Sequence, residues 1–93
     1  MPAYVTLYRW TDQGVKNMSD TVARARQAIA AAEKAGGKIT VLVWTQGWYD
    51  LIGFGEWPDM AFNMNLSKLG NVRTETLPAF DKTGMEAILK KVV

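Results

Sequence analysis

Residues 39–57 have the sequence ITVLVWTQGWYDLIGFGEW, and this stretch decides the fold class of the chain. It predicts two strands, over residues 39–45 and 49–57, because both runs are rich in β-branched and aromatic side chains. Only residues 46–48 (QGW) separate them, and so short a connection is typical of antiparallel neighbours. The middle of the chain is therefore predicted to form a β-hairpin.

The residues before the hairpin predict a strand followed by a helix. Residues 4–10 alternate with the period of a strand, and residues 11–14 (TDQG) have the composition of a turn. Ser19 stands at a helix N-cap position, and the helix is expected to end at glycines 36–37. Its predicted contact stripe is narrow and rich in alanine, and consists of Val22, Ala25, Ile29, Ala32 and Gly36.

The residues after the hairpin predict a helix, a strand and a short final helix. The first helix starts at residues 58–59 (PD) and has an apolar stripe at positions 62, 66 and 69. Residues 72–80 predict a fourth strand. Pro78 cannot donate a backbone hydrogen bond, so this strand, or at least its end, is expected at an edge of the sheet or at a bulge. Residues 81–84 (DKTG) lead into the short helix, which is expected to end near residue 92.

The predicted order is strand, helix, strand, strand, helix, strand and short helix. This is the α+β, ferredoxin-like βαββαβ arrangement, in which a four-stranded antiparallel sheet carries two helices on one face. A chain of 93 residues has the length of one small domain, so residues 1–93 are expected to form a single unit.

Both faces of the predicted sheet carry apolar side chains. In the first strand Tyr4, Tyr8 and Trp10 share one face, while Val5 and Leu7 share the other. An exposed apolar face of that size is unusual in a monomer, so we expect a homo-oligomer, a dimer or a multiple of dimers. We expect the aliphatic face beneath the helices and the aromatic face against a second copy. The alternative is that amphipathic Tyr, Trp and Thr side chains tolerate partial exposure.

The composition excludes several classes of site. The chain has no cysteine and no histidine, which excludes thiolate zinc sites, histidine-held haem and Cys or Ser/His nucleophiles. Its net charge of +2 comes without a basic run, so no nucleic-acid partner is expected. The absence of a long apolar run and of a signal-peptide pattern predicts no membrane contact and a cytoplasmic location. We expect neither a cofactor nor a bound metal, because the acidic residues are scattered singly.

The GWYD sequence at residues 47–50 is the first candidate for a ligand site. Tyr49 has an apolar ring with a polar tip, and it stands beside the carboxylate of Asp50, a combination found in ligand sites. A structural turn explains the same residues, since Gly47 can supply a positive φ and Asp50 can cap backbone donors.

Other candidates lie on the outer strands. Arg73 and Glu75 share a strand face and could clasp a polar ligand group or form an ion pair at the rim. Tyr8 and Trp10 would supply aromatic walls. The glycines of residues 53–58 (GFGEWP) do not complete a dinucleotide-binding fingerprint, and they are expected to relieve crowding against a neighbouring strand.

Taken together, these landmarks resemble the GYD-domain family of small bacterial and archaeal proteins. The resemblance rests on residues 47–50 (GWYD), on residues 10–14 (WTDQG) and on residues 69–80, which run from LGNVRTETL into AF. It implies a ferredoxin-like fold of the dimeric α+β barrel type. It implies no particular reaction, although neighbouring families include cofactor-free monooxygenases, muconolactone isomerases and stress-responsive barrel proteins.

Three hypotheses about function follow. The first, which we favour, is a homo-oligomeric domain that binds an aromatic or apolar small molecule in each subunit. The second is a cofactor-free enzyme, in which Tyr8, Tyr49, Asp50 or Glu75 would act as acid or base after a large pKa shift. The third is a structural or interaction module whose aromatic surface serves assembly. A cavity with a buried carboxylate would favour the enzyme, and a filled sheet face without a cavity would favour the module.

Overall fold

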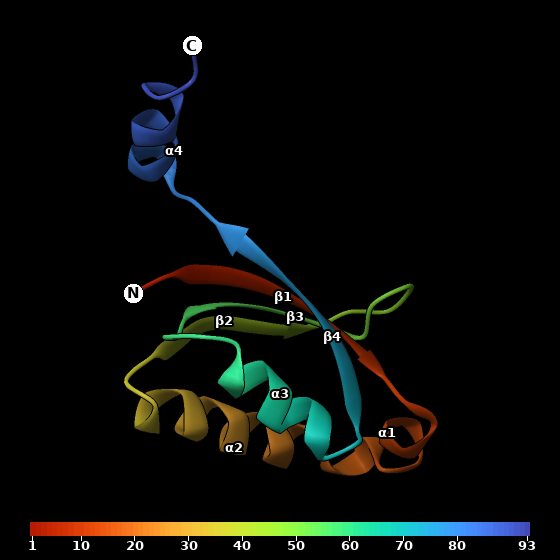
Figure 1. Ribbon diagram of the computed structural model, residues 1–93. Coiled ribbons are helices and arrows are strands. Elements are labelled where there is room, and N and C mark those ends of the chain that lie inside the picture. Colours follow the sequence, from red (N-terminus) through yellow and green to blue (C-terminus); the bar gives the residue numbers. More distant parts are fainter.

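The computed structural model describes residues 1–93 and contains four strands, four α-helices and one 3-10 turn (Figure 1). In chain order they are β1 (Ala3–Trp10), α1 (Asp12–Lys16), η1 (Met18–Asp20), α2 (Thr21–Lys34), β2 (Lys38–Trp44), β3 (Leu51–Glu56), α3 (Ala61–Lys68), β4 (Val72–Ala79) and α4 (Lys82–Leu89).

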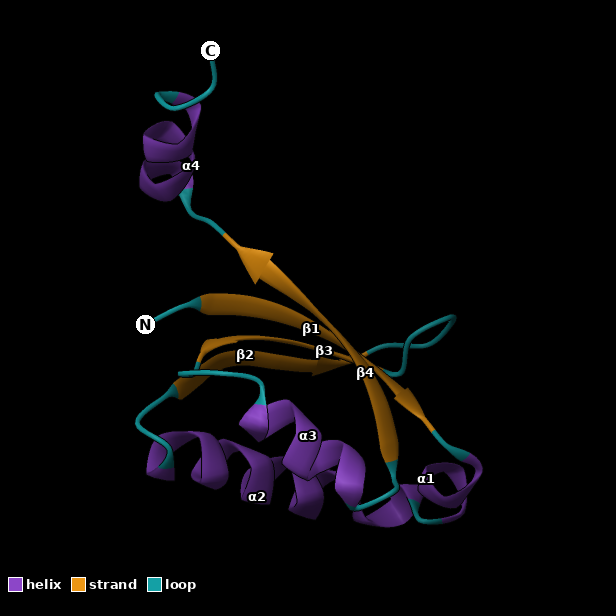
Figure 2. Ribbon diagram, in the orientation of Figure 1, coloured by secondary structure: helices purple, strands orange, loops and turns teal.

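The strands form one antiparallel sheet in the order β2-β3-β1-β4. Helices α2 and α3 cover one face of this sheet, and the other face is left open (Figure 2). The predicted βαββαβ arrangement with a C-terminal helix is confirmed. Strand β4 lies at an edge, as the proline at position 78 predicts. None of the helices is long and apolar enough to cross a membrane.

Several element boundaries differ from the prediction. Residues 12–16 form the short helix α1 rather than a turn, because the Thr11 side chain caps it by accepting a hydrogen bond from the Gly14 amide at 3.1 Å. Ser19 lies within η1, so the predicted N-cap is wrong and α2 begins at Thr21. Strand β3 begins only at Leu51, and residues 49–50 belong to the connection.

The assignment of the two sheet faces is the main correction. The aromatic face of β1 lies beneath the helices, where Thr6 is fully buried and Tyr8 is 6% exposed, whereas Val5 and Leu7 lie on the open face. The reason lies on β3, since Tyr4 pairs with Gly55 and Thr6 with Gly53. Large rings of β1 fit beneath the helices because their neighbours on β3 have no side chain there.

Gly55 also has the crowded position predicted for it. A Cβ at this position would overlap the carbonyl oxygen of Lys38 and lie 2.9 Å from the Cα of Ile39. This close approach occurs where the register of β2 against β3 shifts between Ile39 and Val41. The shift places Ile39 against the core and Val41 on the open face.

The core centres on Trp57, which is 1% exposed and packs with Ala32 and Phe62. Its ring stacks on Tyr4 at 5.0 Å between ring centroids. The Trp57 indole N–H donates to Asn63 Oδ1 at 2.9 Å, and this amide donates in turn to the Thr76 hydroxyl at 2.9 Å. These two hydrogen bonds connect Asn63 on α3 to β4 and to Trp57, which directly follows β3.

The open face carries many apolar side chains, beside a polar group of Arg9, Arg73 and Glu75 near one end. Its partly or largely exposed apolar residues are Val5, Leu7, Val41, Val43, Ile52, Phe54 and Leu77. The prediction that both faces of the sheet are apolar is therefore confirmed, although the roles of the two faces are exchanged.

Candidate functional site

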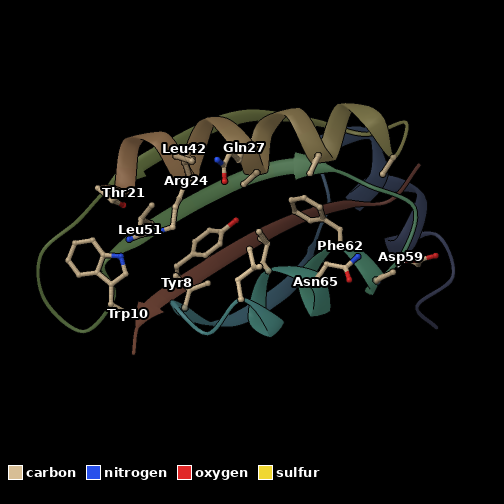
Figure 3. Close-up of a pocket in the computed structure, with 18 of the residues that line it drawn as sticks. Tyr8, Trp10, Thr21, Arg24, Gln27, Leu42, Leu51, Asp59, Phe62 and Asn65 are labelled. Atoms are coloured by element: carbon tan, nitrogen blue, oxygen red, sulfur yellow. Dashed lines mark hydrogen bonds between the residues drawn. The ribbon is translucent and has the colours of Figure 1, made fainter. Parts of the chain in front are cut away.

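A cavity of about 520 Å³ lies between the sheet and the two helices that cover it, and we call it the helix–sheet cavity (Figure 3). Strands β1, β2 and β3 contribute Tyr8, Leu42 and Leu51, and α3 contributes Phe62 and Leu66. Its volume lies in the range of sites that bury a small organic ligand, and its lining is mostly apolar.

The cavity exists because one of its walls is made of short side chains. Helix α2 turns Ala25, Ala28, Ala31 and Ala35 toward it, and α3 adds Ala61. A methyl side chain leaves open the space that a leucine or phenylalanine would fill at the same position. Of the contact stripe predicted from the sequence, Ala25 and Ala32 are buried, and Ala32 packs against Trp57, whereas Val22 is 47% exposed.

Tyr8 lies at the floor of this cavity, beside the position of Gly53. Burial raises the pKa of the Tyr8 hydroxyl above its ordinary value, and the Thr6 hydroxyl offsets part of this effect. The phenol consequently stays protonated near neutral pH. It can donate a hydrogen bond to a ligand, but it is poorly suited to act as a base.

Arg24 brings a positive charge to the same cavity. It reaches from α2 toward the sheet near Leu51 and Trp10 (Figure 3). One terminal nitrogen, Nη1, donates to the backbone oxygen of Asn17 at 2.9 Å, while the other, Nη2, is buried and has no hydrogen-bond partner. A guanidinium with an unpaired buried donor is costly, so the Arg24 side chain is the group of the lining best suited to bind an acceptor oxygen.

The GWYD sequence forms the connection between β2 and β3, and Asp50 has a structural position in it. The Asp50 carboxylate accepts a hydrogen bond from the Trp10 amide at 2.8 Å, and the Asp50 amide donates to the Tyr8 carbonyl at 2.8 Å. Gly47 has a φ of 141°, the positive value predicted for it. Asp50 thus extends the pairing of β1 and β3 beyond the end of the ladder.

Two stretches that lie far apart in the sequence meet at the end of β1. The Thr11 amide donates to the Asn71 carbonyl at 3.1 Å, and the Thr11 hydroxyl donates to the Gly70 carbonyl. The side-chain amide of Gln13 donates from Nε2 to the backbone carbonyl of Leu69 at 3.2 Å. Residues 11–14 and 69–71 therefore form one clamp, which closes the end of the sheet beside the helix–sheet cavity.

The comparisons with known proteins agree with these landmarks. The family model of the GYD domain matches residues 4–89. The chain belongs to the GYD domain family. No curated protein and no solved structure matches it. The match covers the GWYD connection, both halves of the clamp and the lining of the helix–sheet cavity.

A second, shallow depression of about 130 Å³ lies on the open face of this GYD domain. Tyr49, Arg73 and Glu75 line it, and the Tyr49 hydroxyl donates to Glu75 Oε1 at 3.0 Å. This hydrogen bond, together with burial and the charge of Glu75, raises the pKa of Tyr49. The Arg9 guanidinium stacks over the ring of Trp48, with 4.2 Å from its carbon to the ring centroid.

The six residues predicted as a ligand site are divided between two places. Tyr8 and Trp10 line the helix–sheet cavity, whereas Tyr49, Arg73 and Glu75 surround the depression on the opposite face. Asp50 lines neither and holds the backbone between them.

Sequence reasoning missed most of the polar residues of the cavity, which besides Tyr8 are Thr21, Arg24, Gln27, Asp59 and Asn65. The signal for Arg24 was its spacing with Ala28, Ala31 and Ala35, which places a charged side chain on the same side of the helix as a run of small ones. The structure contains no group of three or more Asp and Glu side chains that could hold a metal ion.

Proposed function

We propose that this GYD domain binds a ring-sized apolar small molecule that carries an acceptor oxygen, such as a carboxylate, in the helix–sheet cavity. The observation that carries the proposal is Arg24 in the wall of a cavity of about 520 Å³ whose other walls are mostly alanine and leucine, with one buried guanidinium nitrogen that has no hydrogen-bond partner. The walls would receive the apolar body of the ligand, and Arg24 would bind its oxygen. The protonated Tyr8 hydroxyl is a second donor in the same cavity.

Binding is favoured over catalysis by the chemistry of the lining. Of the acids considered as catalytic groups, Asp50 and Glu75 lie outside the cavity, and Tyr8 inside it is held in its neutral form. The one carboxylate of the lining, Asp59, is exposed and caps the start of α3 by accepting from the Ala61 amide at 2.9 Å. The cavity therefore has no buried carboxylate to act as a general base.

We further propose that the domain acts as a homodimer joined through its open sheet faces. The apolar side chains of that face support this assembly, because a monomer would leave them in water. The helix–sheet cavity lies on the other side of the sheet, so dimerisation would leave it accessible. A purely structural module would need no such cavity, which makes ligand binding the better-supported function.

A pair of matched probes tests the ligand proposal. 1-Naphthoate and its neutral amide have nearly the same shape, and each is titrated against the isotope-labelled protein by NMR. We expect naphthoate to bind more tightly and to shift the Trp10 indole signal. Arg24→Met should weaken naphthoate binding by about 10-fold or more, the magnitude of a charged hydrogen bond, and weaken binding of the amide less, because its carbonyl oxygen carries no charge. Arg26→Met, on the exposed side of the same helix, is the matched control.

A second variant tests the location. Ala28→Trp should fill the cavity and abolish binding of both probes while the circular dichroism spectrum stays unchanged. If neither probe binds the wild-type protein, or if Ala28→Trp binds both as tightly as wild type, the proposal is wrong.

A further inference from the structure

Helix α4 stands apart from the rest of the chain. It projects beyond the end of β4, away from the sheet and from α2 and α3 (Figure 1), and none of its 8 residues is buried. The projection enlarges the molecule. Its radius of gyration is 14.5 Å, against about 12 Å for a compact domain of this length.

The local sequence nevertheless builds a definite helix. The Asp81 carboxylate accepts a hydrogen bond from the Gly84 amide at 2.7 Å, and the Met85 amide donates to the Asp81 carbonyl at 2.8 Å. Even with such a cap, a helix of 8 residues is too short to persist in water by itself. It needs a surface on which to pack.

The side chains of α4 show which side would pack. Met85, Ile88 and Leu89 share one side of α4, Val92 follows after its end, and Phe80 precedes the helix at the root of the arm. Phe80 is 62% exposed, Leu89 54% and Met85 45%. Charged residues lie around this stripe: Lys82 and Glu86 flank it, and Lys90 and Lys91 follow the end of the helix on the far side. An apolar stripe flanked by charges is typical of a helix that docks onto a protein surface.

We infer that residues 80–93 form an arm that docks onto a second copy of this chain. The inference rests on the homodimer proposed above. Strand β4 carries the arm and also contributes Leu77, which is 48% exposed, to the open sheet face. The arm is thus continuous with the face on which the second copy would sit. In a two-fold dimer each arm would reach the body of the other subunit, and the exchange would be reciprocal.

The surface area that a stable dimer must bury also favours a second copy of the chain as the partner of the arm. A stable dimer buries about 800 Å² of each partner. An arm with an apolar stripe and an exposed phenylalanine would extend the contact beyond the sheet edge. A closed, symmetric exchange also leaves no exposed stripe that could recruit further copies.

Paramagnetic labelling distinguishes the two subunits. The chain contains no cysteine, so Glu86→Cys on the flank of the apolar stripe of α4 accepts a single nitroxide label. Labelled subunits without ¹⁵N are mixed with unlabelled ¹⁵N subunits, and the ¹⁵N spectrum is recorded. We expect amide signals in the body of the ¹⁵N subunit to broaden. Adding Ile88→Glu to the labelled chain should abolish this broadening and weaken the dimer by about 10-fold or more, whereas Lys90→Gln should do neither.

Three results would contradict the inference, and they differ in whether the proposed dimer is overturned as well. A dimer in sedimentation whose ¹⁵N partner shows no broadening would overturn the arm and leave the dimer intact. Broadening only when label and ¹⁵N are in the same chain would show that the arm folds back on its own body, which also overturns the inference. A wild-type monomer at 50 μM, roughly 10-fold above the dissociation constant expected for a weak dimer, would overturn both the dimer and the arm.

Discussion

Asp50 shows how a single residue of the GWYD sequence contributes to the fold. Its carboxylate accepts from the partly buried Trp10 amide at 2.8 Å. An asparagine offers the same acceptor oxygen, so Asp50→Asn should change the free energy of unfolding by less than about 0.5 kcal/mol. Asp50→Ala removes the acceptor and should cost about 1–2 kcal/mol in chemical denaturation. Equal losses for the two variants would show that the charge, and not the hydrogen bond, is what matters.

Tyr8 gives the domain a predictable response to alkaline pH. Because burial raises the pKa of its hydroxyl, the unfolded chain loses this proton at a lower pH than the folded chain. The protonated Tyr8 hydroxyl therefore makes its full contribution to the free energy of unfolding below about pH 10. This contribution is lost as the pH rises through the raised pKa. We expect the melting temperature of Tyr8→Phe to fall less steeply above about pH 10 than that of wild type.

Tyr49→Phe is the companion variant in this pH series, because the hydrogen bond to Glu75 raises the pKa of the Tyr49 hydroxyl as well. Its slope should also be shallower than that of wild type, and the effects of the two variants should add. A wild-type slope in Tyr8→Phe would contradict the assignment of the alkaline loss to Tyr8.

Among the elements, the short helix α1 depends on its contact with the turn before β4. A Cβ on Gly14 would overlap the Asn71 carbonyl oxygen and lie 3.2 Å from Trp10 Cβ. The obstacle is backbone, which cannot rotate away as a side chain can. Gly14→Ala should therefore destabilise the domain by about 1–3 kcal/mol, although alanine is the better helix former.

The matched control is Gly84→Ala in the projecting helix α4, where the nearest atoms to a Cβ are side chains at 3.2 Å and 3.7 Å. It should leave the urea midpoint nearly unchanged or raise it slightly. If Gly14→Ala is as stable as wild type, the clamp between residues 11–14 and 69–71 is more pliable than its geometry indicates.

For the whole molecule, the open sheet face decides the assembly that we propose. Phe54 lies on this face and is 39% exposed. Covering about 800 Å² on each partner at about 25 cal/mol per Å² of apolar area gives more than about 10 kcal/mol before the costs of association. We expect a dimer in sedimentation at micromolar concentration. Phe54→Arg should weaken it by about 100-fold or more, because a charge would be placed in an apolar contact.

Met64→Arg is the control for the assembly, since Met64 is 69% exposed on α3, on the opposite side of the sheet. It should dimerise like wild type. A folded monomer of the wild-type chain at micromolar concentration would contradict the proposed dimer.

The order of elements could be predicted from the sequence because it depends on local patterns. Alternation marked β1, the short connection at residues 46–48 marked the hairpin of β2 and β3, and Pro78 marked an edge strand. Each signal acts within a few residues. The family landmarks could likewise be recognised from the sequence, and the GYD domain match covers residues 4–89.

Only the tertiary structure decided which face of the sheet lies beneath the helices. A period of two shows that Tyr4, Thr6 and Tyr8 share a face, but it does not show which face is covered. That choice depended on β3, where Gly53 and Gly55 leave room for the rings of β1. Because the face with Tyr8 is the covered one, Tyr8 lies in the helix–sheet cavity and Tyr49 lies on the opposite side of the sheet. Two residues that the sequence assigned to one ligand site are therefore separated by the thickness of the sheet.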